Sequence, residues 1–163
     1  MGVLITGSAG FIGFHLAKKM SAKQKVLGID NLNNYYSQKL KNDRIKLLKK
    51  NKNFKFIKLD ISNFVKLDRI IKKNNITEII HLAAQAGVRY SITNPRTYLT
   101  SNLVGYFNIL ECCKKNNIKF LMYASSSSVY GMNNNFPLKE SYKTDYPLQF
   151  YAATKKSNEI MAH

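Results

Sequence analysis

The sequence predicts an α/β fold built on a parallel sheet that is covered by helices on both faces. Short apolar runs alternate with helical patterns along the whole chain, and this order produces strand–helix–strand units. The first apolar run, residues 3–5, leads directly into a glycine-rich turn at residues 7–13 and then into a helical pattern. We therefore expect a doubly wound, Rossmann-type sheet with the strand order 3-2-1-4-5.

The individual elements follow from the periodicity of the apolar residues. Strands are expected at residues 3–5, 26–29, 54–59, 78–82 and 118–124. Helices are expected after Gly10, over residues 37–50, 63–73 and 95–117, and from about Tyr151, whereas residues 131–149 should form a loop. Three of these helices carry regularly spaced apolar residues. On the helix over residues 37–50 we expect Leu40, Leu47 and Leu48 to face the core. The other two sets are Ile12, Leu16 and Met20 on the first helix, and Leu99, Leu103, Phe107 and Leu110 on the helix over residues 95–117.

Length and composition favour one globular domain. The chain has 163 residues, of which 45% are hydrophobic, and it has no apolar run of the ~18 residues that a membrane span needs. The chain begins directly with the glycine motif, so no signal peptide is expected and the cytoplasm is the expected location. Cys112 and Cys113 lack metal-ligand spacing, and His15, His81 and His163 show none either, so no metal is expected.

The net charge of +17 raises the possibility of nucleic-acid binding, which the pattern of basic residues disfavours. Most of the 26 basic residues are lysines spread over helix faces among many asparagines. This distribution indicates solvated surface rather than a nucleic-acid interface. The charge could still attract an anionic nucleotide-sugar. The arginines are Arg44, Arg69, Arg89 and Arg96.

The glycine turn and two acidic residues predict a dinucleotide site. A glycine-rich turn between a strand and a helix lets backbone N–H groups approach a pyrophosphate, although a tight turn without a ligand has the same pattern. Asp30 ends the second strand, where a carboxylate accepts hydrogen bonds from ribose hydroxyls and repels a 2′-phosphate. This placement favours NAD over NADP. Alternatively, Asp30 is a solvated loop residue or a helix cap. Asp60 ends the third strand and could bind the adenine amine or cap the next helix.

Tyr151 and Lys155 are four residues apart on an expected helix and therefore share one face. A nearby ammonium lowers the pKa of a phenol from its usual value near ~10, toward the range in which the phenolate acts as a general base. The pattern is weak by itself, but a serine run at residues 125–128 follows the fifth strand. These hydroxyls could hold a sugar hydroxyl beside Tyr151, or they could simply form a turn.

These residues resemble the extended short-chain dehydrogenase/reductase superfamily, in its NAD-dependent nucleotide-sugar epimerase/dehydratase branch. The resemblance covers the whole chain, and the segments 28–36, 84–91 and 151–163 are similar to UDP-glucuronate 4-epimerases. In the 4,6-dehydratases an Asp-Glu pair follows the catalytic Thr, and UDP-glucuronate decarboxylases have Glu at the position of Ser128. Here the two positions are Ser127 and Ser128, which favours an epimerase.

The resemblance implies a role for each matching residue. Ser126 stands at the catalytic Ser/Thr position, Tyr151 is the base, and Lys155 anchors the nicotinamide ribose. Besides Tyr151 and Lys155, the implied cofactor contacts are Gly7, Gly10, Phe11, Ile12, Gly13, Asp30, Asn31, Asp60, Ile61, Leu82, Ala83, Ala84, Gln85 and Asn102. The expected substrate contacts are Arg89, Ser126, Ser127 and Ser128.

The implied function is the NAD-dependent 4-epimerisation of a nucleotide-sugar, UDP-glucuronate to UDP-galacturonate, through a transient 4-keto intermediate in a homodimer. A UDP-glucose 4-epimerase, another nucleotide-sugar-modifying relative and an inactive NAD-binding fragment stay open as alternatives. Members of the family are about twice as long. We therefore expect residues 1–163 to be the NAD-binding domain, with the C-terminal substrate domain absent and the chain ending within the helix that carries Tyr151 and Lys155. Alone, this chain should be inactive.

Overall fold

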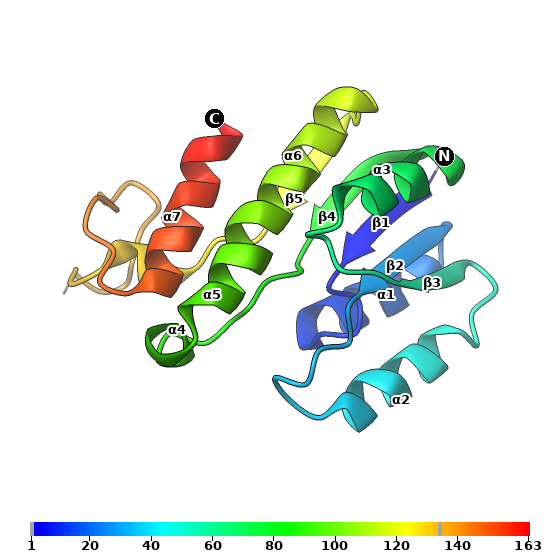
Figure 1. Ribbon diagram of the computed structural model, residues 1–163, viewed down its shortest axis with the longest axis horizontal. Helices are drawn as coiled ribbons and strands as arrows, with labels where there is room; N and C mark the ends of the chain where they lie inside the picture. The colour runs from blue at the N-terminus through cyan, green and yellow to red at the C-terminus, as the bar shows by residue number, and fades with distance from the viewer. Residues whose placement is uncertain (1, 134) are drawn as a thin grey trace.

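The computed structural model describes residues 2–133 and 135–163, and in this part of the chain five parallel strands form one sheet. Met1 and Asn134, the latter within the expected 131–149 loop, lie outside the described residues. The sheet order is β3-β2-β1-β4-β5, which confirms the predicted fold class and strand order (Figure 1). The strands are β1 (Gly2–Thr6), β2 (Val26–Asp30), β3 (Phe54–Lys58), β4 (Ile76–His81) and β5 (Phe120–Tyr123).

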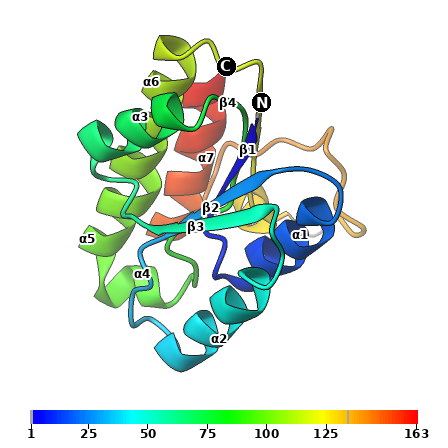
Figure 2. The same cartoon turned by 90° about the vertical axis from the view of Figure 1, so that its right-hand side faces the viewer.

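Helices connect the strands and cover both faces of the sheet. On one face lie α1 (Phe11–Ser21) and α2 (Gln38–Leu48), and Figure 2 shows them across the sheet from α3 (Phe64–Lys73) and α6 (Gly105–Lys115). The chain also forms α4 (Tyr90–Thr93), α5 (Pro95–Tyr98), the π-helix η1 (Leu99–Val104), the 3₁₀ helix η2 (Ser127–Tyr130) and α7 (Phe150–Ala162). The expected long helix over 95–117 is therefore α5, η1 and α6 in succession, and α4 was not predicted. No helix in the described ranges has the length and apolar composition of a membrane span.

Alternation along the strands builds two hydrophobic cores, one on each face of the sheet. Val3 and Ile5 of β1 pack toward α1 and α2 with Phe14 and Ile45. Leu4, between them, packs on the opposite face with residues of α3 and α6. Burying one such aliphatic side chain contributes roughly 1.5–3 kcal/mol, so these two layers supply most of the free energy that holds the helices on the sheet.

Two of the expected core-facing positions on the helices are wrong. On α2, Leu40 and Leu47 are 45% and 54% exposed, and the buried positions are Lys41, Ile45 and Leu48. On α1, for which no core-facing set was expected, Ile12 is exposed toward the cavity and the helix buries Gly13, Phe14, Ala17 and Ser21. The apolar spacing predicted α2 correctly but not its rotation, because an exposed or cavity-facing apolar residue can share the period of core-facing ones.

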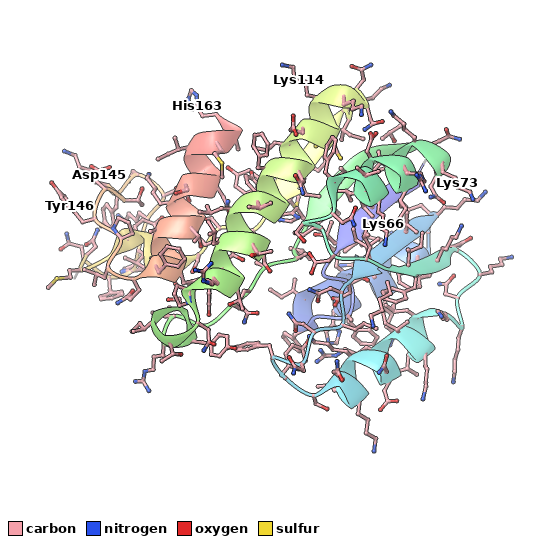
Figure 3. All side chains as sticks on the ribbon, viewed as in Figure 1. Lys66, Lys73, Lys114, Asp145, Tyr146 and His163 are labelled. Atoms are coloured by element: carbon pink, nitrogen blue, oxygen red, sulfur yellow. The ribbon has the colours of Figure 1, made fainter. Side chains whose placement is uncertain are left out.

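The third apolar set lies mainly on the outside of the molecule. Leu99 and Phe107 are about half exposed, whereas the opposite side of the same helix buries Tyr98, Tyr106 and Ile109. Lysines of the neighbouring helices are solvated as expected: the side chains of Lys73 on α3 and Lys114 on α6 point outward in Figure 3.

Candidate functional site

A cavity of about 530 Å³ opens at the carboxyl-terminal ends of the strands. It lies where β1 pairs with both β2 and β4, the point at which an open parallel sheet binds its ligands. Most of the predicted cofactor contacts line it. They are Gly7, Gly10, Phe11, Ile12, Gly13, Asp30, Asn31, Asp60, Ile61, Leu82, Ala83, Ala84 and Gln85.

The glycine turn forms the floor of this cavity at the start of α1. Gly7 has a positive φ of 69°, which favours glycine, and its carbonyl accepts the N–H of Gly10 at 2.9 Å. A Cβ on Gly13 would collide with the Gly7 carbonyl oxygen, so α1 can pack onto the turn only with glycine at this position. No side chain caps α1, so its first N–H groups remain available at the positive end of the helix.

Asp30 and Asp60 line the end of the cavity at which β2 and β3 terminate, and neither caps a helix. The Asp30 carboxylate accepts the N–H of Ala9 at 3.1 Å and that of Leu32 at 2.8 Å. Asp60 accepts the amide of Asn31 at 2.8 Å and the N–H of Ser62 at 2.9 Å. Burial raises the pKa of Asp60, but these hydrogen bonds together lower it more, so the pKa of this carboxyl lies below its usual value. Ser37 and Asn63 cap α2 and α3, so the capping alternative is wrong for both acids.

The β2–α2 connection and α2 contribute a wall of the cavity that the sequence did not predict. This wall includes Tyr35, Tyr36, Lys41 and Arg44. Tyr35 also packs against Tyr90 of α4, with 4.9 Å between the two ring centroids. In the sequence, segment 28–36 shows only a resemblance to a family, and the lysines have the pattern of solvated surface residues. No local signal therefore identifies these side chains as part of the cavity.

Tyr151 and Lys155 lie on α7, directly behind the cavity wall rather than in it. The Lys155 ammonium is buried and donates to the carbonyl of Ala124, a lining residue, at 2.8 Å. Burial lowers the pKa of Lys155 to about 8. The ring of Tyr151 packs edge-on against Tyr98 at 6.0 Å, and the Tyr98 hydroxyl donates to the carbonyl of the lining residue Ala86 at 2.8 Å.

Asn102 holds α7 against the loop that follows β4. Its amide group donates to the Gln85 carbonyl and to the Thr154 hydroxyl, both at 3.1 Å, and its side-chain oxygen accepts the Gln85 N–H at 2.8 Å. The side chain is 1% exposed and does not line the cavity. In this structure Asn102 therefore positions the helix of Tyr151 and Lys155.

A second buried group lies beside Lys155. The Thr6 hydroxyl accepts the N–H groups of Leu82 and Ala83, so its own proton points to Nδ1 of His81 at 2.9 Å. Burial, with the Lys155 charge as the next cause, lowers the pKa of His81 to about 3. His81 is therefore a neutral structural residue, in agreement with the role expected for the histidines.

The serine run is held at the other end of α7. Ser125 donates to Glu159 of α7 at 2.6 Å. The Ser126 oxygen accepts hydrogen bonds from the N–H and the hydroxyl of Ser128, at 3.2 and 2.9 Å. Ser127 is exposed on the same 3₁₀ turn, and Arg89 is exposed at the start of α4. The structure thus brings Ser126 and Ser128 together next to α7, and the role of Arg89 stays a prediction.

The residues present fit a dinucleotide. Free N–H groups at the start of α1 suit a pyrophosphate, and the two carboxylates at the ends of β2 and β3 suit hydroxyl and amine donors. The cavity volume is in the range of cofactor sites.

Comparison with known proteins agrees with this geometry. A family model described as GDP-mannose 4,6 dehydratase matches residues 4–163. The chain belongs to this family. Protein CapI of Staphylococcus aureus is 54% identical over the whole chain, which covers 49% of that protein, and the probable UDP-glucuronate 4-epimerase of Rhizobium meliloti is 47% identical over the whole chain, which covers 48% of it.

A solved structure shows the same fold with ligands. The UDP-glucuronic acid 4-epimerase of Bacillus cereus, in complex with UDP-glucuronic acid and NAD, is 36% identical with a TM-score of 0.90. The match covers 100% of this chain and 51% of that one. The chain spans about half the length of the curated relatives it matches.

Proposed function

We propose that the protein is the cofactor-binding part of an NAD-dependent nucleotide-sugar 4-epimerase that acts on UDP-glucuronate. The observation that carries the proposal is the placement of Tyr151 and Lys155 directly behind the wall of a dinucleotide-type cavity, which they reach through Ala124 and Tyr98. Relatives of this chain carry the same activity in their names, and one was solved with both ligands.

In the proposed reaction Tyr151 removes the proton of the sugar C4 hydroxyl as the general base, with Lys155 about one turn further along α7. Ser126 positions that hydroxyl, because its own proton is free to donate while its oxygen accepts from Ser128. When bound, NAD would supply a reversible hydride acceptor for the sugar C4, so that the hydride could return to the opposite face of the sugar with no net consumption of the cofactor. The sugar therefore passes through a transient 4-keto form, and Tyr151 returns the proton to complete the epimer.

The Asp30 end of the cavity would hold the adenosine half of the cofactor, and Lys155 would hold the nicotinamide ribose. Ser127 and Ser128 would donate hydrogen bonds to the sugar carboxylate. Arg89 would act on the loop or on a phosphate. The half-exposed Leu99 and Phe107 support a homodimer through this helix surface, and the free thiols of Cys112 and Cys113 suit the cytoplasm.

The test joins this chain to the C-terminal half of the Bacillus cereus enzyme and measures conversion of UDP-glucuronate. Tyr151→Phe should reduce turnover by roughly three orders of magnitude or more, because it removes the base, and should leave NAD bound. Tyr146→Phe on the exposed 131–149 loop is the matched control. Normal turnover by Tyr151→Phe would refute the mechanism, and faster turnover of UDP-glucose would favour the UDP-glucose 4-epimerase.

A further inference from the structure

Two cations of α2 lie at the Asp30 end of the cavity. The Lys41 ammonium donates to the backbone and side-chain oxygens of Asn33 at 2.8 and 2.6 Å. The Arg44 guanidinium donates to the Ala9 carbonyl at 3.1 Å and to the Tyr36 hydroxyl at 3.2 Å. Lys41, Arg44 and Tyr36 all line the cavity, and Lys41 is only 4% exposed. Lys41 is therefore not the solvated surface charge expected of the lysines, and Arg44 is only partly exposed.

The same hydrogen bonds hold the two cations close to the carboxylate of Asp30. The Ala9 N–H donates to Asp30, and the carbonyl of this same residue accepts from Arg44. On the other side Leu32 donates its N–H to Asp30, and the next residue, Asn33, accepts from Lys41. Burial lowers the pKa of Lys41, the charge of Asp30 raises it, and the charge of Arg44 lowers it. Both charges are therefore close enough to act on Lys41.

This arrangement changes what Asp30 does to a 2′-phosphate. A lone carboxylate at the end of β2 would repel a phosphate that carries about −1.5 to −2 charges. Here the two cations Lys41 and Arg44 balance the two carboxylates Asp30 and Asp60, so this end of the cavity carries no net negative charge. Arg44 uses one of its terminal nitrogens on Ala9 and Tyr36, and a guanidinium has five N–H donors in a fork that suits phosphate.

We propose that Arg44, supported by Lys41, sets the cofactor specificity of this chain, so that the cleft also binds NADP(H) and only modestly prefers NAD(H). Asp30 accepts hydrogen bonds from the ribose hydroxyls of NAD, and Arg44 donates hydrogen bonds to the 2′-phosphate of NADP. The inference rests on the proposed function, because it takes the cavity to be a nicotinamide dinucleotide site.

The experiment measures the dissociation constants of NAD⁺ and NADP⁺ by titration calorimetry at about 0.15 M salt, where long-range attraction to the chain is screened. For the original chain the two constants should lie within about tenfold of each other, a difference of about 1.4 kcal/mol. Arg44→Gln should weaken NADP⁺ about five- to tenfold, the effect of one charge-assisted hydrogen bond, and change NAD⁺ less than about twofold.

Arg69→Gln is the matched control, because it removes the same charge from an exposed position on α3 that does not line the cavity. It should leave the NADP⁺ to NAD⁺ ratio unchanged. Asp30→Asn keeps the shape of the side chain and should shift the preference toward NADP⁺. Circular dichroism of each variant verifies that it is folded.

The outcomes separate the two proposals. If the chain binds NAD⁺ but excludes NADP⁺ by more than about a hundredfold, or about 2.8 kcal/mol, Asp30 dominates and the inference is overturned. Equal ratios for Arg44→Gln and Arg69→Gln overturn it as well. If the folded chain binds neither dinucleotide, the proposed function itself is wrong, and the inference is overturned with it.

Discussion

Replacing Lys155 with methionine should stabilise the fold at neutral pH while weakening cofactor binding. Lys155 is 5% exposed, and burial lowers its pKa from 10.5 to about 8. At about pH 7 the buried ammonium is still largely protonated. The gap between 10.5 and about 8 corresponds to roughly 3 kcal/mol of unfavourable free energy for the charged form in the folded state.

Methionine has a similar length and no charge, so Lys155→Met removes this penalty. It also leaves the Ala124 carbonyl without its donor, which costs roughly 1–2 kcal/mol. The net expectation is a gain of roughly 1–2 kcal/mol in the free energy of unfolding near neutral pH. A residue that destabilises the fold in this way is typical of a functional site.

The pH dependence supplies the sharper test. The folded-state pKa of Lys155 is lowered, so the unfolded chain binds more protons between about 8 and 10.5, and the original chain gains stability as the pH rises through that window. Lys155→Met lacks this gain, so its advantage should shrink between about pH 7 and about pH 10.

Urea unfolding followed by circular dichroism at both pH values measures the difference. Lys114→Met is the control, because Lys114 is exposed on α6 (Figure 3). The reasoning is refuted if Lys155→Met is less stable than the original chain at neutral pH, or if its advantage is the same at both pH values.

Three further predictions concern the cavity and its support. Gly13→Ala should destabilise the fold by roughly 1–3 kcal/mol and abolish NADH binding, since its Cβ would push α1 off the Gly7 carbonyl; unchanged urea unfolding would contradict the close packing. Asn102→Ala should cost about 3 kcal/mol of unfolding free energy, because it leaves the buried backbone N–H and carbonyl of Gln85 without their partner, and an effect below about 1 kcal/mol would argue against the network. Tyr35→Ala should speed NADH release about tenfold in stopped-flow fluorescence, because it removes a cavity-lining ring that packs against Tyr90, whereas Tyr146→Ala, at an 82% exposed position, should not.

Much of the fold was predictable because it is encoded locally. A strand of five residues in a parallel sheet is a short apolar run, and all five runs became strands with bounds within two residues of those expected. The glycine turn was equally predictable: Gly7 needs a positive φ and Gly13 needs close packing, and both requirements show in the spacing of the glycines. The cavity at the strand ends then follows from the alternation of strands and helices.

Helix rotation was less predictable. Periodicity indicates that one face of a helix is apolar, but an apolar face can contact the core, a ligand cavity or another molecule. On α1 the residues Phe11 and Ile12 face the cavity, as expected for cofactor contacts, whereas on α2 Leu40 faces the cavity instead of the core, so only α2 is rotated away from the expected orientation.

The sequence alone determined the fold class, the order of the strands, the glycine turn and the pairing of Tyr151 with Lys155 on one helix. Only the tertiary structure decided that Lys41 and Arg44 lie beside Asp30, and that Asn102 serves α7 rather than lining the cavity. The physical reason is the range of the interactions. Turns and strand runs depend on neighbours in the chain, whereas hydrogen bonds such as those from Arg44 to Ala9 and from Asn102 to Thr154 join residues that become neighbours only when the helices pack on the sheet.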